Sequence, residues 1–317
     1  SVLIVAAIGS KLRFVSLIWF VPLWATVVCL PLMHMMFYWA GADAITDAAK
    51  AVATATDEVA RRAAHAKLDE TNADAGWLYK KGVIDYAGGT VFAMGAGIAA
   101  LIGRRFLGEA QRGNDDLAVS PTFRPAGPIL IWLGWFGLIA VSYLDFGDWI
   151  TRLAMANAFA ATAAAAAIGM MMEWALRGAV TLRGVLYCAL GGVIAVVPAA
   201  GFASPLGAAV LGIIGGAMTA AFIPRAFPAS ALPLVYFLNG TLGMVATGIL
   251  VNQALGGTGV MDYSIGRNSD YDLYAQMVSQ FWGLAITILW TAAASAAIYA
   301  VIDATIGLRP AERRADS

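Results

Sequence analysis

Long runs of apolar residues, separated by short polar segments, dominate the chain. Eight runs have the length and continuity of candidate transmembrane helices: Phe14–Trp39, Val83–Leu107, Ile129–Tyr143, Trp149–Trp174, Leu182–Val197, Leu206–Ile223, Leu232–Leu255 and Tyr274–Ile306. A helix needs about 20 apolar residues to cross the hydrocarbon core of a bilayer. We therefore expect the ends of the short third run to extend. The long last run must tilt or continue into water.

The periodicity of these runs separates helices from strands. A membrane β-barrel strand alternates apolar and polar residues over about ten positions, whereas these runs are continuous and longer. The sequence therefore predicts an all-α fold, a polytopic transmembrane helical bundle that forms a single membrane domain over residues 1–317. Ser1–Gly9 is apolar but too short to span. It is expected to be the second half of a helix, so the bundle is read as incomplete on its N-terminal side.

Composition supports the membrane assignment and excludes other classes. Hydrophobic residues make up 60% and charged residues 13% of the chain, against about 45–50% and 25% in soluble domains. This excludes a water-soluble enzyme, a disordered protein and, since the net charge is zero, a nucleic-acid-binding protein. The partner indicated is the lipid bilayer. Cys29 and Cys188 have no neighbours at metal-ligand spacing, and no HExxH, GxSxG or P-loop pattern occurs, so we expect no metal, no cofactor and no enzymatic activity.

The distribution of charge predicts the orientation in the membrane. The two ends and the alternate loops on one side carry most of the basic residues, namely Lys11, Arg13, Arg104, Arg105, Arg112, Arg124, Arg177, Arg183, Arg225, Arg309, Arg313 and Arg314. The short loops of the other side carry only Arg152 and Arg267 among several aspartates. The positive-inside rule places both ends of this segment in the cytoplasm, and we expect a bacterial inner (plasma) membrane.

The segment Gly41–Lys81 is the exception to this charge pattern. It is long, charge-balanced and rich in Ala, Glu, Lys and Arg, which favours helix, and long loops weigh less in setting orientation. We predict one extracytoplasmic helix, a helical insertion at 41–81. Two interpretations stay open: a docking element for a partner, or a solvated cap over the mouth of the bundle.

A few polar residues fall in or beside the spans, where burying a polar or charged side chain in the membrane is costly. Asp85 precedes a helix start, so it can cap that helix or attract a cation at the outer mouth. Glu173 and Asp303 lie near cytoplasmic helix ends, where we expect their charge to reach water. Asn157 and Asn239 need hydrogen-bond partners, and Asn239 is a candidate pore residue. The 34 glycines favour tight helix packing or a narrow pore.

Several motifs in order resemble one family. Val83–Val91 (VIDYAGGTV) is similar to the signature of the ammonium transporters, the Amt/Mep/Rh family. Further similar segments are Ile131–Gly137, Asn157–Ala167 with Glu173-Trp174, Pro198–Phe202 and Asp303–Arg309. The resemblance implies that the eight runs correspond to family helices four to eleven, and that the protein is a homotrimer or part of a larger assembly. The family pore is built from two inverted five-helix repeats, so a partner chain or another segment would have to supply nearly three helices.

The same resemblance implies a set of pore positions, several of which carry unusual residues. The positions that match the family's pore or substrate-binding residues are Phe37, Asp85, Ala93, Leu138, Ser142 and Asn239. The family's two facing histidines fall on Ala93 and Asn239. Its outer aromatic, usually Trp, falls on Phe37, and its inner gate Phe falls on Leu138. Asp85 and Ser142 are retained.

These replacements leave two functional hypotheses. Ala93 offers no hydrogen bond, and Asn239 can accept one but cannot relay a proton as histidine can. The first hypothesis is a transporter that conducts ammonium, ammonia or a similar small solute through an altered pore, supported by Asp85 and Ser142. The alternative is a non-transporting structural or sensory subunit of a larger membrane complex. It is supported by the lost histidines and the insertion.

Overall fold

The computed structural model describes residues 2–8, 12–37, 42–107, 126–143, 148–222, 231–262 and 267–309. It is helical apart from a two-stranded antiparallel pairing of β1 (Met261–Asp262) with β2 (Arg267–Asn268). The first half contains α1 (Val2–Ile8), α2 (Phe14–Trp24), η2 (Ala25–Cys29), α3 (Leu30–Met36), α4 (Ala42–Thr54), α5 (Glu58–Ala73), α6 (Trp77–Lys80), η3 (Gly89–Met94) and α7 (Gly95–Leu107). The second half contains α8 (Ala126–Val141), α9 (Trp149–Arg177), α10 (Leu182–Val196), η4 (Val197–Ala199), α11 (Pro205–Phe222), α12 (Leu232–Leu250), η6 (Gln253–Leu255) and α13 (Leu273–Thr305).

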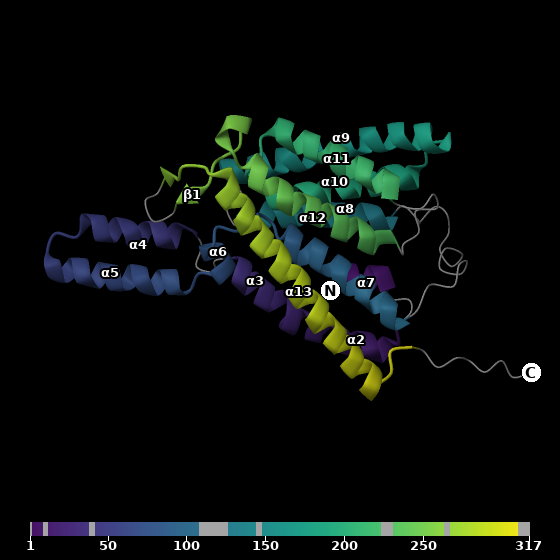
Figure 1. The fold of residues 1–317 in the computed structure, drawn as a ribbon, viewed down its shortest axis with the longest axis horizontal. Helices are drawn as coiled ribbons and strands as arrows, with labels where there is room; N and C mark the ends of the chain where they lie inside the picture. The colour runs from purple at the N-terminus through teal and green to yellow at the C-terminus, as the bar shows by residue number, and fades with distance from the viewer. Residues whose placement is uncertain are drawn as a thin grey trace, which may run out of the picture.

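The helices agree closely with the apolar runs. Within the described residues, 7 helical segments are long and apolar enough to cross a membrane, and Ala126–Val141 is a shorter apolar helix at the place of the short third run. The predicted all-α membrane bundle is confirmed. α13 has 33 residues, or about 50 Å of helix, and it runs diagonally along the bundle (Figure 1).

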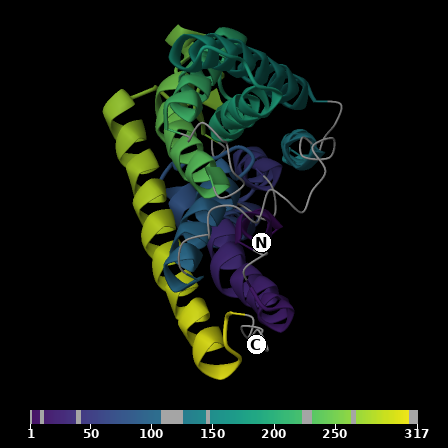
Figure 2. The same cartoon turned by 90° about the vertical axis from the view of Figure 1, so that its right-hand side faces the viewer.

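The bundle has two groups of helices joined by α12. α9, α10 and α11 pack closely on one another, and α13 packs on α7, α12 and α2. Figure 2 shows α13 along one edge, with α9 to α11 gathered at one end of the view. α12 contacts both groups, including η3 and α7, so the centre of the molecule lies around α12 and η3.

Glycine makes the close approach of α9 and α11 possible. A Cβ on Gly212 would overlap the backbone of Ala161, and a Cβ on Gly216 would lie 2.6 Å from the carbonyl oxygen of Ala165. Small residues allow helix backbones to meet where lipid provides no hydrophobic drive. The tight-packing interpretation of the glycines therefore holds for this helix pair.

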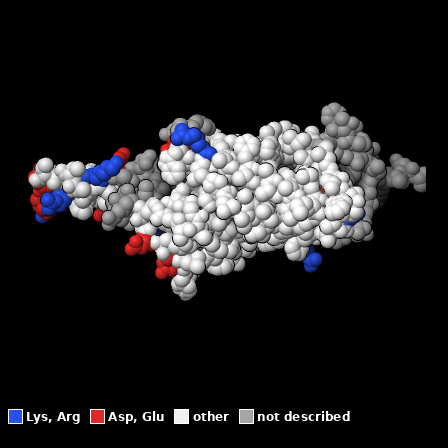
Figure 3. All heavy atoms as spheres, turned by 90° about the horizontal axis from the view of Figure 1, so that it is seen from above, with Lys and Arg blue, Asp and Glu red and all other residues white. Residues whose placement is uncertain are grey.

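The segment between α3 and α6 is a helical hairpin rather than the one helix that the sequence predicts. α4 and α5 lie antiparallel and project away from the bundle (Figure 1). The break between them falls at Asp57, whose carboxylate accepts a 2.7 Å hydrogen bond from Ala60 N and starts α5. An N-cap residue has a non-helical backbone, so it interrupts the alanine-rich stretch and begins a second helix after the interruption. Lys, Arg, Asp and Glu gather on this projection, whereas the visible face of the bundle is largely uncharged (Figure 3).

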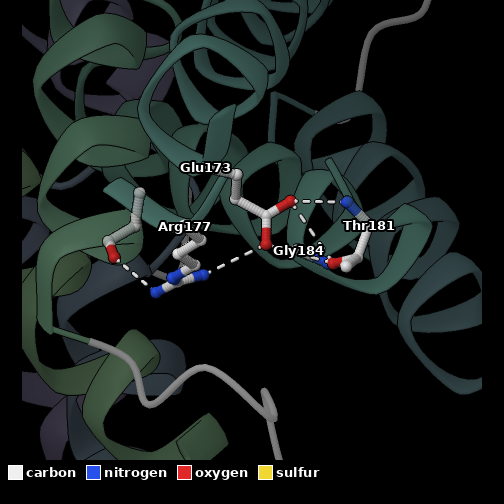
Figure 4. Close-up of polar contacts among 5 residues, drawn as sticks. Glu173, Arg177, Thr181 and Gly184 are labelled. Carbon is white, nitrogen blue, oxygen red and sulfur yellow. Dashed lines mark hydrogen bonds and ion pairs between the residues drawn. The ribbon is translucent and has the colours of Figure 1, made fainter. Parts of the chain in front are cut away.

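The prediction that Glu173 reaches water is wrong. Its side chain is 0% exposed and forms a 3.0 Å ion pair with Arg177, which is 12% exposed. The Glu173 carboxylate also accepts hydrogen bonds from the Thr181 backbone (2.9 Å) and hydroxyl (3.0 Å), while Arg177 donates to the Ala220 carbonyl at 2.8 Å (Figure 4). Gly184 leaves room for the carboxylate. These partners close the α9–α10 turn against α11, and they compensate the burial of both charges. Asp303, by contrast, is exposed as predicted.

Candidate functional site

Asp85 caps the first turn of η3. The Asp85 side chain is 6% exposed. One carboxylate oxygen accepts a hydrogen bond from Gly89 N at 2.8 Å and the other accepts one from Thr90 N at 2.9 Å. The capping role predicted from the sequence is therefore confirmed. Gly88 precedes the helix with φ of +73°, a conformation that glycine adopts without strain.

The segment that carries Asp85 is fastened to the start of α13. Gln280 donates to Ile84 O at 2.9 Å and accepts from Ile84 N at 2.8 Å. Gln276 donates to Gly82 O at 2.9 Å, and Ser279 donates to Lys81 O at 2.6 Å. Three side chains of one helix thus satisfy the irregular backbone just before Asp85, from the exposed bond at Lys81 to the part-buried bonds at Gly82 and Ile84.

The Gln280 amide also reaches α12. It donates to Met244 O at 3.0 Å, and the Thr90 hydroxyl of η3 donates to Met244 Sδ at 3.0 Å. The sequence-based prediction did not include Gln276, Gln280 or Met244. Two glutamines four residues apart in an otherwise apolar run provided a signal, because amides in a span need partners.

Asn239 is buried in α12 and its amide is turned toward α11. The residue is 1% exposed, and Nδ2 donates to Thr219 Oγ1 and to Val235 O, both at 3.0 Å. Its Oδ1 is buried without a hydrogen-bond partner among the described residues. A Cβ on Gly215 would lie 2.8 Å from this Oδ1. Asn239 therefore presents one free acceptor in a confined space beside α11.

Ala93 lies in η3 and is 0% exposed. The residue after it, Met94, packs on the residue after Asn239, since a Cβ on Gly240 would be 2.9 Å from Met94 Cβ. The structure thus brings together the two helices that carry Ala93 and Asn239.

Phe37 lies at the end of α3, close to the Asp85 segment. Its Cζ is 3.6 Å from the Cβ position of Gly88, and its carbonyl accepts a 3.2 Å hydrogen bond from Gly76 N, just before α6. The last described residue before the hairpin, Phe37, is therefore bonded to Gly76, which follows the hairpin in the chain. The fold joins this predicted outer residue both to Asp85 and to the root of the insertion.

Leu138 and Ser142 belong to a different part of the bundle. Both are half-buried, Leu138 on α8 and Ser142 directly after its last residue, and the main contacts of α8 are with α9 and α10. The Ser142 hydroxyl donates to Leu138 O at 2.6 Å, so its proton is used at the end of this helix. The described contacts do not place these two residues beside Asp85 or Asn239.

Comparison with known proteins agrees with this arrangement. The model of the Ammonium Transporter Family matches residues 1–316. The chain belongs to this family. It is 33% identical over 246 residues to an ammonium transporter of Aquifex aeolicus, covering 75% of this chain and 55% of the relative. It is 28% identical over 263 residues to an ammonium transporter of Bacillus subtilis, covering 81% of this chain and 56% of the relative.

Solved structures show the same fold. Mep2 of Saccharomyces cerevisiae matches with a TM-score of 0.68 at 19% identity, over 98% of this chain and 64% of Mep2. A protein described as a Sensor Amt Protein matches with a TM-score of 0.64 at 17% identity, over 90% of this chain and 84% of that protein. The chain spans a little over half the length of the ammonium transporters that it matches in sequence.

Proposed function

We propose that the full-length protein conducts ammonia, ammonium or a similar small solute through an altered ammonium-transporter pore. The observation that carries the proposal is the Asp85-capped turn of η3 packed against α12, where Asn239 holds a buried acceptor without a partner. A buried unpaired acceptor costs about 1–3 kcal/mol, and a passing N–H donor would relieve that cost. Phe37 would lie at the outer end of this path. Leu138 on α8 and Ser142 just after it would lie at a separate position.

The pore residues favour a neutral cargo. A charged ammonium ion loses its hydration in a dry pore, which is costly without paired charges. Ala93 supplies no polar group, and an amide such as Asn239 does not titrate near neutral pH, so no side chain at these two positions relays a proton. Neutral ammonia, or another small neutral hydrogen-bond donor, is the easier solute.

The proposed setting follows from charge and family. We place the protein in a bacterial inner membrane as a homotrimer or a larger assembly, with both ends of this segment cytoplasmic and the 41–81 insertion outside. The basic residues in the short loops and ends on the proposed cytoplasmic side support this orientation. In this arrangement the insertion lies above the outer mouth beside Phe37.

Flux measurements on the full-length protein in liposomes test the proposal. Ammonia entry is followed with an internal pH dye, and methylammonium uptake is followed with radioactive tracer. Ammonia entry faster than in empty vesicles, with little tracer uptake, is expected. Rates equal to those of empty vesicles for both solutes would refute conduction.

The alternative is a sensory or structural subunit. Two observations favour it: both histidine positions carry non-titrating residues, and a charged hairpin is rooted at Phe37 beside the Asp85 segment. In this case a partner docks on the α4–α5 hairpin. Solute binding near Asp85 then changes the affinity of the hairpin for the partner, and partner binding changes the affinity for solute. Deleting 42–73 in the full-length protein should then release a co-purifying membrane partner while the flux stays at the level of empty vesicles. Normal flux with an unchanged partner profile would exclude this alternative.

A further inference from the structure

The membrane span that ends beside Phe37 has an irregular middle. α2, η2 and α3 follow one another without interruption over Phe14–Met36, and η2 is a π-helix. Pro31 lies in the first turn of α3. Proline has no N–H, so Pro31 cannot donate to the carbonyl of Val27, four residues earlier, as a residue in a regular α-helix would. Proline and π-helical turns are both common causes of a helix kink, and this span contains both.

A side chain of α13 supplies the donor that Pro31 lacks. Trp290 Nε1 donates to Val27 O at 3.1 Å. Both residues are partly exposed, and at an exposed position of a membrane span the lipid offers no partner in place of this donor. Among the described residues, the other hydrogen-bonded indoles, of Trp24 and Trp132, donate to side-chain hydroxyls. Trp290 instead satisfies a main-chain carbonyl that a proline has freed.

The part of the span before the π-helix is attached to α13 by a second bond. Trp24 Nε1 donates to the Ser295 hydroxyl at 3.1 Å, and both side chains are buried. η2 also contacts α13, whereas α3 packs mainly on α6. α13 therefore holds the span on one side of the irregular turn through Ser295 and within the turn through Trp290. The direction in which α3 leaves the turn depends on the second of these bonds.

The direction of α3 decides where Phe37 lies. The Phe37 ring has its Cζ 3.6 Å from the Cβ position of Gly88, and the Phe37 carbonyl accepts from Gly76 N at 3.2 Å. Helix with a rise of about 1.5 Å per residue places Phe37 about 15 Å beyond Val27, so a change of about 10° at the turn would move Phe37 by roughly 3 Å. Such a movement is large enough to break the bond to Gly76 and the contact at Gly88.

We infer that Trp290 is a positioning residue for Phe37. By donating to the carbonyl that Pro31 leaves free, Trp290 sets the direction of α3 and with it the place of Phe37 beside the segment that Asp85 caps. The effect on the place of Phe37 does not depend on conduction. The effect on flux rests on the proposed function: a displaced Phe37 weakens solute binding at the outer mouth, which raises KM and leaves the maximal rate nearly unchanged.

Trp290→Phe in the full-length protein tests the inference, because it removes the indole N–H and keeps an aromatic ring. Hydrogen exchange at Gly76 N–H reports the bond to the Phe37 carbonyl, and we expect it to become at least threefold faster. Exchange at Thr181 N–H, which donates to Glu173 in the distant α9–α10 turn, should stay unchanged, and this separates a displaced α3 from a general loss of stability. Ammonia flux into liposomes should fall about threefold at low ammonia concentration and recover at high concentration.

Two further variants make the test decisive. Trp19→Phe is the matched control, because this indole of α2 is 55% exposed and forms no hydrogen bond among the described residues. Pro31→Ala gives Val27 O a donor within its own helix, so it should straighten the span and also speed exchange at Gly76 while Trp290 is intact.

The outcomes separate the inference from the proposed function. Gly76 exchange in Trp290→Phe equal to that of the Trp19→Phe control would overturn the inference, whatever the flux. In a conducting protein, faster exchange with normal flux at low ammonia would overturn the role of Trp290 at the mouth. Faster exchange with flux at the level of empty vesicles in every protein would support the positioning role and refute the proposed function.

Discussion

The side-chain amide of Gln280 is paired with both backbone groups of Ile84. Its oxygen accepts from Ile84 N at 2.8 Å and its nitrogen donates to Ile84 O at 2.9 Å, as a neighbouring β-strand would do. The next residue is Asp85, so α13 sets the position of the carboxylate that caps η3. Gln280 itself is 1% exposed.

Replacing Gln280 by Leu should therefore loosen the Asp85 segment. The substitution removes the Gln280 bonds to Ile84 N and Ile84 O, and each unpaired buried group costs about 1–3 kcal/mol. We expect Tm to fall by several degrees and hydrogen exchange at Ile84 and Gly89 to become faster. Phe281→Leu, at a side chain that is 52% exposed on the same turn, is the matched control. Equal exchange in the two variants would contradict the positioning role of Gln280.

Asp85 itself should show a graded effect. Asp85→Asn keeps one acceptor oxygen and can serve only one of the two N–H groups, while Asp85→Ala serves neither. We expect a loss of about 1–3 kcal/mol for Asn and roughly twice that for Ala, read from denaturation in detergent. Asp272→Ala removes an exposed N-cap at the start of α13, with an expected cost of about 1 kcal/mol. An Asp85→Ala loss no larger than this control would show that the buried cap contributes little.

The sequence was sufficient for most of the fold because its apolar runs are continuous and separated by turn and charge signals. Each of the eight runs contains a helix, although Val83–Leu107 is helical only from Gly89, and Asp85 was identifiable as a cap from its place before Gly88 and Gly89. The helical hairpin was less predictable. One alanine-rich stretch fits one helix or two equally well by propensity, and only the Asp57 cap divides it.

Site geometry was harder to predict, because burial depends on neighbours far away in the chain. Glu173 sits near a helix end, where a charge usually reaches water, but it is bonded to Thr181 and paired with Arg177, which in turn donates to Ala220 O of α11. Asn239 was recognisable as a polar residue in a span, whereas the direction of its amide depends on Thr219 in another helix. Hydrogen bonds between distant helices have no local pattern in the sequence.

Glu173→Gln should be strongly destabilising. The substitution removes the carboxylate charge that forms a 3.0 Å ion pair with the Arg177 guanidinium, 12% exposed, and breaking a buried pair costs about 3–5 kcal/mol. Denaturation of the variant in detergent gives the loss directly. Glu58→Gln, in an exposed pair with Arg62 on the hairpin, should cost about 0–1 kcal/mol. Similar losses for the two variants would mean that burial of the Glu173 pair does not matter.

The free acceptor of Asn239 should control conduction if the proposed path passes it. Asn239→Leu removes Oδ1 and should lower ammonia flux about tenfold, the equivalent of roughly 1.4 kcal/mol for one hydrogen bond in the pore. Thr219→Val is the matched control, because it removes the 3.0 Å partner of Nδ2 but keeps the Oδ1 acceptor, so its flux should stay near that of the unmodified protein. Stopped-flow measurements on liposomes with equal amounts of folded protein compare the two. Full flux in Asn239→Leu would show that the solute does not use this acceptor, and an equal loss in both variants would assign the effect to packing between α11 and α12.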